Sequence, residues 1–167
     1  GGLDALSGRR IATEAQALLQ LSALPGVGLR GLRGLVSTFG SARVALEASR
    51  ARFAALTTNR AASARDAPLI EAATRDGLRR AADAGMVLCT WSVPRYPTMV
   101  HQMADPTPVL FLRGRVERLA RPGVTIVGSR KATARGREIA RSLGAALAHS
   151  GITVVSGMAL GIDGAAH

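Results

Sequence analysis

Residues 124–157 read VTIVGSRKATARGREIARSLGAALAHSGITVVSG, and this stretch decides the fold. Two short apolar runs rich in β-branched residues, 124–127 and 152–155, flank a segment over about 134–149 whose apolar side chains recur at helical spacing. A strand, a helix and a strand in this order are typical of a βαβ unit, whose strands are parallel and whose crossover is right-handed. The sequence therefore predicts a parallel sheet in the C-terminal part of the chain.

Upstream of this unit the chain changes character near Gly85. Two further short strands are expected at 86–91 and 109–112, separated by a proline-rich loop. Before them, the spacing of leucines and the position of glycines and prolines predict helices over 12–24, 29–39, 41–49 and 68–84, with the polar stretch 57–67 as a connection. We therefore expect an α/β protein with an all-helical domain over 1–85 and a parallel-sheet domain over 86–167.

The charge is strongly positive, which bears on the partners of the chain. The 167 residues carry 22 Lys and Arg against 11 Asp and Glu, a net charge of +11. The excess lies in the first 65 residues and in residues 113–141, while 66–112 are nearly balanced. Two basic zones indicate a polyanion partner, bound through its phosphates and therefore sensitive to salt. An arginine-rich genome explains the preference for Arg over Lys, but it explains the shortage of acids less well.

The turn Leu24-Pro-Gly-Val-Gly28 separates the first two expected helices and is the first candidate contact with DNA. Gly26 and Gly28 permit a turn with positive φ, and the helix that follows presents unpaired N–H groups at its start. Such a helix start attracts phosphate, and Arg30 and Arg33 lie one turn further on. This resembles a helix-hairpin-helix motif in a SAM-like helical domain. A tight helical hairpin packed for shape alone is an equal alternative.

The second candidate site follows the strand 124–127. Gly128 permits a sharp turn, the Ser129 hydroxyl can bond an anion, Arg130 offers a bidentate fork to a phosphate, and Lys131 adds charge. Neither GxGxxG nor GxxxxGK[ST] is present, so a dinucleotide site and a P-loop are not expected. The plainer alternative is a helix cap beside a solvated arginine.

The third candidate site, Ser156-Gly157, follows the strand 152–155. Parallel neighbouring strands end at the same edge of a sheet, so this loop and Arg130 are expected to form one anion pocket. Asp163 is interpreted as the N-cap of the next helix, and His167 lies within helical reach of Asp163. One carboxylate and one histidine do not make a catalytic or metal site, so neither is predicted.

The run TIVGSRKATARGREIARSLGAALAHSGITVVSGMALGIDGAAH resembles the signature of the DprA/Smf family of DNA-processing proteins. The match consists of VGSR after the strand, Gly136 in the helix, and SGxAxGID with a terminal AH. The segment YPTMVHQMADPTPVLFLRG and the LPGVG hairpin followed by TFGS also resemble the family, so the likeness covers about 18–167.

The resemblance implies an extended Rossmann-like domain that binds single-stranded DNA without sequence preference and without catalysis. By motif position, Gly128, Ser129, Arg130 and Lys131 would hold a phosphate, supported by Ser156 and Gly157. It also implies protection of incoming DNA in natural transformation (competence), loading of the RecA recombinase, a homodimer and a cytoplasmic location. No cofactor, metal or membrane is implied.

The family's Rossmann-like domain continues beyond the terminal AH with further strands, basic residues and its dimerisation surface. We therefore expect a fragment or truncated gene product, or a sheet that another polypeptide completes. DNA affinity, dimerisation and RecA contact then depend on sequence beyond His167. An apolar run long enough to cross a bilayer is not seen in the sequence, and Cys89 is expected to be a buried, reduced thiol.

Two other functions stay open on the sequence. The first is a Rossmann-fold enzyme that binds or hydrolyses a nucleotide at the same sheet edge, as lysine decarboxylase-like hydrolases do. Its PGGxGTxxE-like loop is absent here, so its catalytic residues would lie in other sequence. The second is a protein-interaction role for the helical domain, with its basic face simply solvated.

Overall fold

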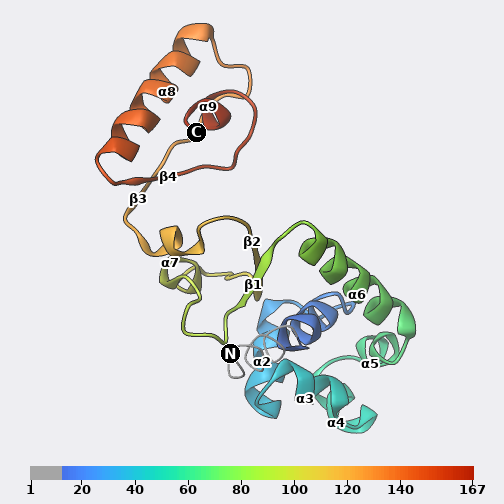
Figure 1. The fold of residues 1–167 in the computed structure, drawn as a ribbon. Coiled ribbons are helices and arrows are strands. Elements are labelled where there is room, and N and C mark those ends of the chain that lie inside the picture. The colour runs from blue at the N-terminus through green and yellow to red at the C-terminus, as the bar shows by residue number, and fades with distance from the viewer. Residues whose placement is uncertain (1–12) are drawn as a thin grey trace. The chain divides into compact units, whose positions relative to one another are not determined.

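A computed structural model describes residues 13–167 of the chain (Figure 1). These residues form two compact units that meet at the Gly114–Arg115 bond. No helix in the described part of the chain is long and apolar enough to cross a membrane.

The first unit is built mainly from helices. The described part of the first helix covers 13–22, since Ala12 of the expected 12–24 helix lies outside the described residues. The others are α2 (Leu29–Phe39), α3 (Ala42–Glu47), α4 (Arg50–Leu56), α5 (Asn59–Arg65) and α6 (Pro68–Asp83). Side-chain oxygens of Ser41, Ser49 and Thr58 cap α3, α4 and α5.

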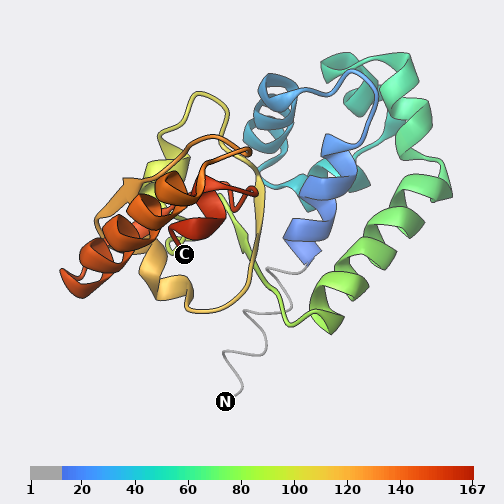
Figure 2. The same cartoon turned by 90° about the horizontal axis from the view of Figure 1, so that it is seen from above.

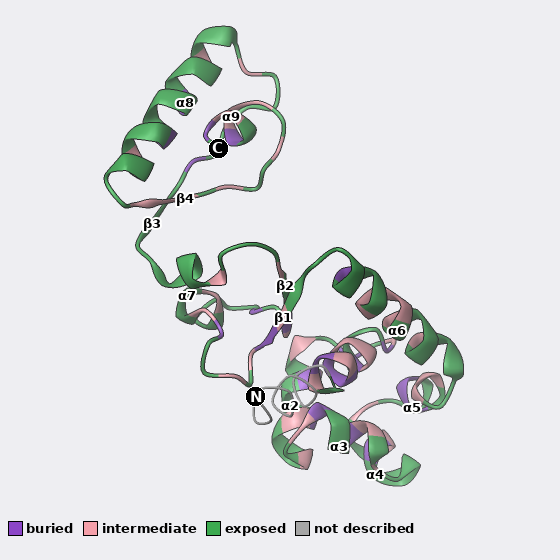
Figure 3. Ribbon diagram, viewed as in Figure 1, coloured by how far each residue is buried: buried purple, intermediate pink, exposed green. Residues whose placement is uncertain are grey.

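One apolar core holds these helices together. Phe53, Leu18, Leu21, Leu32 and Leu35 are at most 1% exposed. Figure 3 shows the buried residues (purple) on the sides where the helices of this unit face one another. Burial of such side chains contributes about 1.5–3 kcal/mol each, so the core is the main source of stability in this unit.

A two-stranded antiparallel ribbon completes the first unit. Strand β1 (Val87–Thr90) pairs with β2 (Val109–Leu112), in the register that places Thr90 opposite Val109. Val109 is buried in the helical core, which ties the ribbon to the helices. Between the strands lies the short helix α7 (Thr98–His101). Both strands were expected, and they pack with the helices of the first unit; the expected domain boundary at residue 85 stays a prediction.

The second unit contains the predicted βαβ arrangement. After the 3-10 helix η1 (Val116–Ala120), strand β3 (Gly123–Thr125) pairs in parallel with β4 (Thr153–Val155). Helix α8 (Ala134–His149) connects them, and α9 (Ile162–Ala165) follows β4. Figures 1 and 2 both show α9 (red) beside α8 (orange). The expected α/β fold, a helical part followed by the start of a Rossmann-like parallel sheet, is confirmed.

The core of the second unit is small. Its buried apolar residues are Ile126, Ala140 and Ala166, with Ile162 and Val154 partly buried against them. Gly144 lets α8 approach the end of α9, because a β-carbon at Gly144 would lie 2.1 Å from the carbonyl oxygen of Ala166. Close packing of small residues therefore replaces large side chains here.

Several short elements differ from the expectations, and α7 lies in the segment that was expected to be a loop. The stretch 50–67 contains α4 and α5, where no helix was expected over 50–56 and a polar connection was expected over 57–67. Helix α4 forms because Ser49 caps it and Phe53 is buried. Helix α5 forms because Thr58 caps it and Ala61 and Ala62 are buried. Strand β3 is shorter than the expected 124–127, although Ile126 still donates its N–H to the carbonyl oxygen of Val155 at 2.9 Å.

Candidate functional site

The candidate anion site lies where β3 and β4 end. In the loop after β3, Gly128, Ser129, Arg130 and Lys131 are all exposed. The Ser129 hydroxyl accepts a hydrogen bond from the backbone N–H of Lys131 at 3.1 Å, which closes a tight turn. The turn holds the two basic residues at the start of the connection to α8.

The loop after β4 has a matching construction. The Ser156 hydroxyl accepts a hydrogen bond from the backbone N–H of Met158 at 3.0 Å. Met158 itself adopts φ of +53°, a conformation that few non-glycine residues take. Its side chain and that of Leu160 are exposed. Each loop thus contains a serine whose hydroxyl accepts the backbone N–H of the residue two positions later.

Asp163 joins the two loops. One carboxylate oxygen accepts the backbone N–H of Gly128 at 3.1 Å, and the other accepts the N–H of Gly157, also at 3.1 Å. Asp163 is only 6% exposed. The expected convergence of the two loops at one edge of the sheet is therefore seen directly: all six predicted phosphate-binding residues, 128–131 and 156–157, lie on loops that one carboxylate links.

Two sequence interpretations of this segment are wrong. Asp163 is not the N-cap of the last helix: it lies inside α9, whose N-cap residue is Gly161, and its carboxylate bonds to the two loops instead. His167 does not meet Asp163; its Nε2 atom lies 2.9 Å from the Ser156 hydroxyl oxygen. Local spacing suggested a cap and a helical pair, but contacts distant in sequence decide the positions of both side chains.

The start of α9 also presses against the first loop. A β-carbon at Gly128 would lie 2.7 Å from two side-chain atoms of Ile162. The backbone N–H of Ile162 donates to the carbonyl oxygen of Ser129 at 3.2 Å. Glycine at 128 is therefore needed for space, and the loop, α9 and the Asp163 carboxylate form one packed assembly. We call it the loop clamp, made of residues 128–131, 156–157 and 161–163.

The loop clamp carries two exposed basic side chains, those of Arg130 and Lys131. Among residues 13–167, neither Arg130 nor Lys131 has an ion-pair partner, and the Arg130 side chain forms no hydrogen bond. The backbone N–H groups of Ser129 and Arg130 have no acceptor within the same part of the chain. Exposed cations and free N–H donors at a sheet edge are suited to a phosphate.

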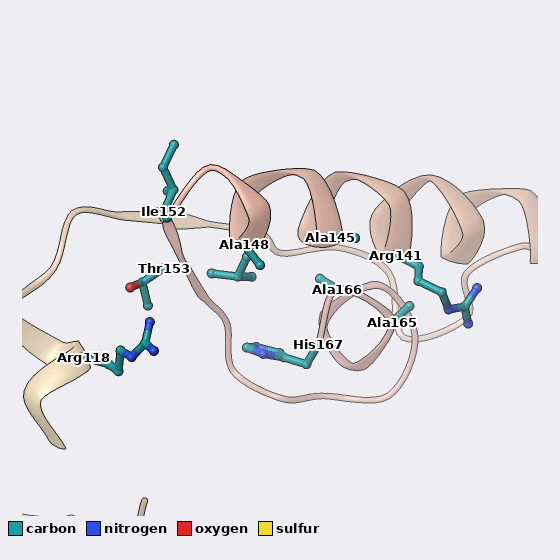
Figure 4. A pocket seen from close by; sticks show the side chains of 12 residues that line it. Arg118, Arg141, Ala145, Ala148, Ile152, Thr153, Ala165, Ala166 and His167 are labelled. Carbon is teal, nitrogen blue, oxygen red and sulfur yellow. The ribbon is translucent and has the colours of Figure 1, made fainter. Parts of the chain in front are cut away.

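A basic cavity of about 400 Å³ lies in the same unit (Figure 4). Arg118, Arg141 and His167 line it, with small side chains of α8 and α9 forming its walls. The Nε2 atom of His167 lies 2.9 Å from the Ser156 hydroxyl oxygen, so this contact joins the cavity to the loop clamp. This cavity was not predictable from the sequence, since its basic residues come from three segments that only the fold brings together. They add to the positive potential around the loop clamp.

The LPGVG turn in the first unit has the expected positive φ at Gly26 but not at Gly28, whose φ is −80°. Gly26 has φ of +79°, and Gly28 is the N-cap of α2 without any side-chain cap or acid in the first turn. Arg30 is exposed, whereas the Arg33 guanidinium stacks 5.8 Å from the centre of the Trp91 ring. A contact between these four residues and DNA stays a prediction.

No group of three His, Cys, Asp or Glu residues that could hold a metal ion occurs within residues 13–167. Asp163 is the functional residue that sequence reasoning misjudged. It is the only acid between residues 139 and 167. A lone carboxylate just after two glycine-bearing loops was the available signal.

Comparisons with known proteins show what this chain is similar to. The family described as DNA recombination-mediator protein A matches residues 87–167. Protein Smf of Synechocystis is 42% identical over 78 residues, which cover 44% of this chain and 20% of that protein. The chain is similar to the DprA/Smf family over residues 87–167.

Two further DprA proteins extend the likeness upstream. The DNA processing protein DprA of Bacillus subtilis is 29% identical over 121 residues, covering 60% of this chain and 41% of that protein. The X-ray structure of DprA from Streptococcus pneumoniae shares the fold, with a TM-score of 0.58 at 21% identity, over 90% of this chain and 50% of that one. The chain thus spans half or less of the length of these DprA/Smf relatives.

Proposed function

We propose that this chain binds single-stranded DNA through its sugar–phosphate backbone, without reading the base sequence. The observation that carries the proposal is the loop clamp. Asp163 holds together the loops after β3 and β4, and the loop after β3 presents Arg130 and Lys131, neither of which has an ion-pair partner within residues 13–167. A phosphate replaces counterions and water at such a site, so affinity comes mainly from electrostatics.

The proposed contacts with a DNA phosphate use the groups of the two loops that are free of hydrogen bonds and ion pairs within the described residues. The Arg130 guanidinium and the Lys131 ammonium bind the phosphate, assisted by the Ser129 and Arg130 amides. Ser156 and Gly157 form the opposite wall of the phosphate site. Gly128, which has no side chain, allows the phosphate to approach the backbone of the first loop closely. The net charge of +11 raises the local concentration of DNA before contact. Gly26, Gly28, Arg30 and Arg33 form a secondary contact.

The wider role proposed is that of the DprA relatives, whose names describe DNA processing. The chain contributes to protection of incoming DNA during natural transformation and to loading of RecA, as a non-catalytic component without a cofactor, located in the cytoplasm. The complete protein acts as a homodimer. The chain spans half or less of its relatives, so these activities belong to the whole protein.

A nucleotide-hydrolysing enzyme is the second candidate, and one observation favours it. The Ser156 hydroxyl and the His167 imidazole are 2.9 Å apart, the arrangement of a nucleophile and its base. Among the described residues, however, no carboxylate orients the imidazole, because Asp163 is engaged with Gly128 and Gly157. DNA binding is therefore preferred, and a nucleoside monophosphate hydrolysis assay tests the alternative.

Fluorescence anisotropy with labelled oligo-dT tests DNA binding by the full chain. The logarithm of the binding constant should fall linearly with the logarithm of the salt concentration, with a slope of about −0.7 for each phosphate contacted. The matched probe is oligo-dT with an uncharged methylphosphonate backbone, which keeps the bases and should not bind. Absence of oligo-dT binding at low salt by a folded chain would falsify the proposal, as would equal affinity for the two backbones.

A further inference from the structure

The Asp163 carboxylate is a charged group in a buried position. It is 6% exposed, and no Arg, Lys or His of the described residues forms an ion pair with it. A buried carboxylate is costly unless hydrogen bonds replace its water shell. Here the N–H groups of Gly128 and Gly157 supply them, one to each oxygen. The two loops and the carboxylate therefore depend on each other.

We propose that Asp163 is the positioning residue of the DNA site, resting on the proposed function above. Its two oxygens fix the spacing of the loops after β3 and β4, and so fix where Arg130 lies relative to Ser156. Asp163 also occupies the amides of Gly128 and Gly157. The phosphate is consequently bound one residue further out, by the Ser129 and Arg130 amides and the basic side chains.

The chemistry of the clamp requires a carboxylate. Both partners are backbone donors, so the residue between them must offer two acceptor atoms. An asparagine offers one acceptor oxygen and one NH₂ group, and the NH₂ group would face a donor. In the Asp163→Asn variant one loop therefore loses its partner, while side-chain size stays almost the same.

Charge alone predicts the opposite effect of this substitution. Asp163 carries a negative charge close to the proposed phosphate, so its removal should strengthen binding if the residue acts only through its field. If Asp163 positions the loops, its removal should weaken binding. The sign of the change in affinity therefore distinguishes the two roles.

The test measures oligo-dT affinity and its salt dependence for the full chain carrying D163N, R130A or both. We expect D163N to bind about tenfold more weakly, the scale of one lost hydrogen bond to a charged group, with a salt slope smaller by about 0.7. The double variant should bind no more than about twofold more weakly than R130A, because the two substitutions remove the same contact with the phosphate. The control is E138Q, which removes an exposed carboxylate of α8 that bonds Arg141, and it should bind as tightly as the unmodified chain or tighter.

A loss of stability alone would lower the active fraction of D163N and leave the salt slope unchanged, and that result overturns the proposal. So does unchanged or tighter binding by D163N while R130A binds weakly, a pattern that leaves the proposed function standing. If the unmodified chain fails to bind, or R130A binds as well as it does, the proposed function fails and the inference falls with it.

A second measurement needs no variant, in case D163N does not fold. In ¹⁵N-labelled unmodified chain, the Gly128 and Gly157 amides should exchange slowly with solvent, both free and bound to oligo-dT. The Ser129 and Arg130 amides should exchange fast in the free chain and become protected on binding. Fast exchange of both glycine amides, or protection that appears at them only with DNA, overturns the assignment.

Discussion

Gly161 lies so close to Ser129 that a β-carbon built on Gly161 would stand 2.1 Å from the Ser129 carbonyl oxygen. Gly161 also has φ of +95°, a conformation that side chains disfavour. Gly161 thus packs the start of α9 against the Ser129–Arg130 loop, while the Asp163 carboxylate bonds that loop to the loop after β4. A residue outside the predicted binding set therefore controls the position of the Ser129–Arg130 loop.

The Gly161→Ala variant should lose both stability and DNA affinity, because the new methyl group must push the Ser129–Arg130 backbone away. Thermal unfolding should show a lower Tm, and oligo-dT anisotropy should show weaker binding. The matched control is Gly151→Ala, which has φ of +76° but open space around the new β-carbon. It carries the strain of positive φ alone, about 1–2 kcal/mol, and should keep its DNA affinity. Equal effects of the two variants on binding would contradict the close contact.

Arg130 should contribute both charge and geometry to binding. Arg130→Ala removes a charge-assisted hydrogen-bonding group worth about 1.5–3 kcal/mol and should reduce the salt slope by about 0.7. Arg130→Lys keeps the charge but loses the bidentate fork, so we expect weakened affinity with the salt slope retained. Anisotropy over a salt series measures both quantities.

The control for Arg130 is Arg141→Ala. It changes the net charge by the same amount, but Arg141 already bonds Glu138 at 2.6 Å on α8. Its affinity should fall much less. If Arg141→Ala weakens binding as much as Arg130→Ala does, the site is a diffuse basic surface instead of the loop clamp.

The parallel pair and its two loops were predictable because their signals are local. Apolar runs of strand length, a segment of helical period and glycines at the turns give strand, helix and strand in order, and parallel pairing then brings Arg130 and Ser156 to one edge. The limits expected for α2 and α8 agree with the structure for the same reason.

Contacts distant in sequence were not predictable. Asp163 bonds Gly128, a residue 35 positions earlier, and no local pattern encodes that pairing. The helix α5 was missed for a different reason: its buried residues are Ala61 and Ala62, and alanine gives little apolar contrast in a polar stretch. Small buried residues and tertiary hydrogen bonds thus account for the main errors.

Phe53 should be the most sensitive position of the helical core. Its side chain is fully buried, and the Arg65 guanidinium covers its ring with 4.6 Å to the ring centre. Phe53→Ala should lower the free energy of unfolding by about 3–5 kcal/mol, because a cavity replaces the ring. Urea unfolding followed by circular dichroism measures it. The control Leu69→Ala alters a side chain on a residue that is 77% exposed and should change stability by about 0.5 kcal/mol or less; a similar loss in both would contradict this core assignment.

Cys89 should be a slow-reacting thiol in the folded chain. The residue is 1% exposed, and burial raises the pKa of its thiol above the ordinary value of 9.0, against a smaller opposing effect of Arg95. Because the thiolate is the reactive species, both burial and the raised pKa slow its reaction with a disulfide reagent at pH 8. Because the folded state holds the thiol proton more tightly than the unfolded state does, protonated Cys89 contributes to the free energy of unfolding. This contribution is complete below about pH 9 and is lost as the pH rises through the folded-state pKa.

Absorbance of the released thiol of Ellman's reagent gives the rate. We expect slow, single-site labelling in buffer and rapid labelling in urea, where the thiol regains water. Cys89→Ser supplies the blank, since the chain has one cysteine. Labelling of the folded chain as fast as the urea-unfolded chain would mean that β1 opens readily from β2, because Cys89 pairs with Leu110 in that ribbon and is reached only when the ribbon separates from the core.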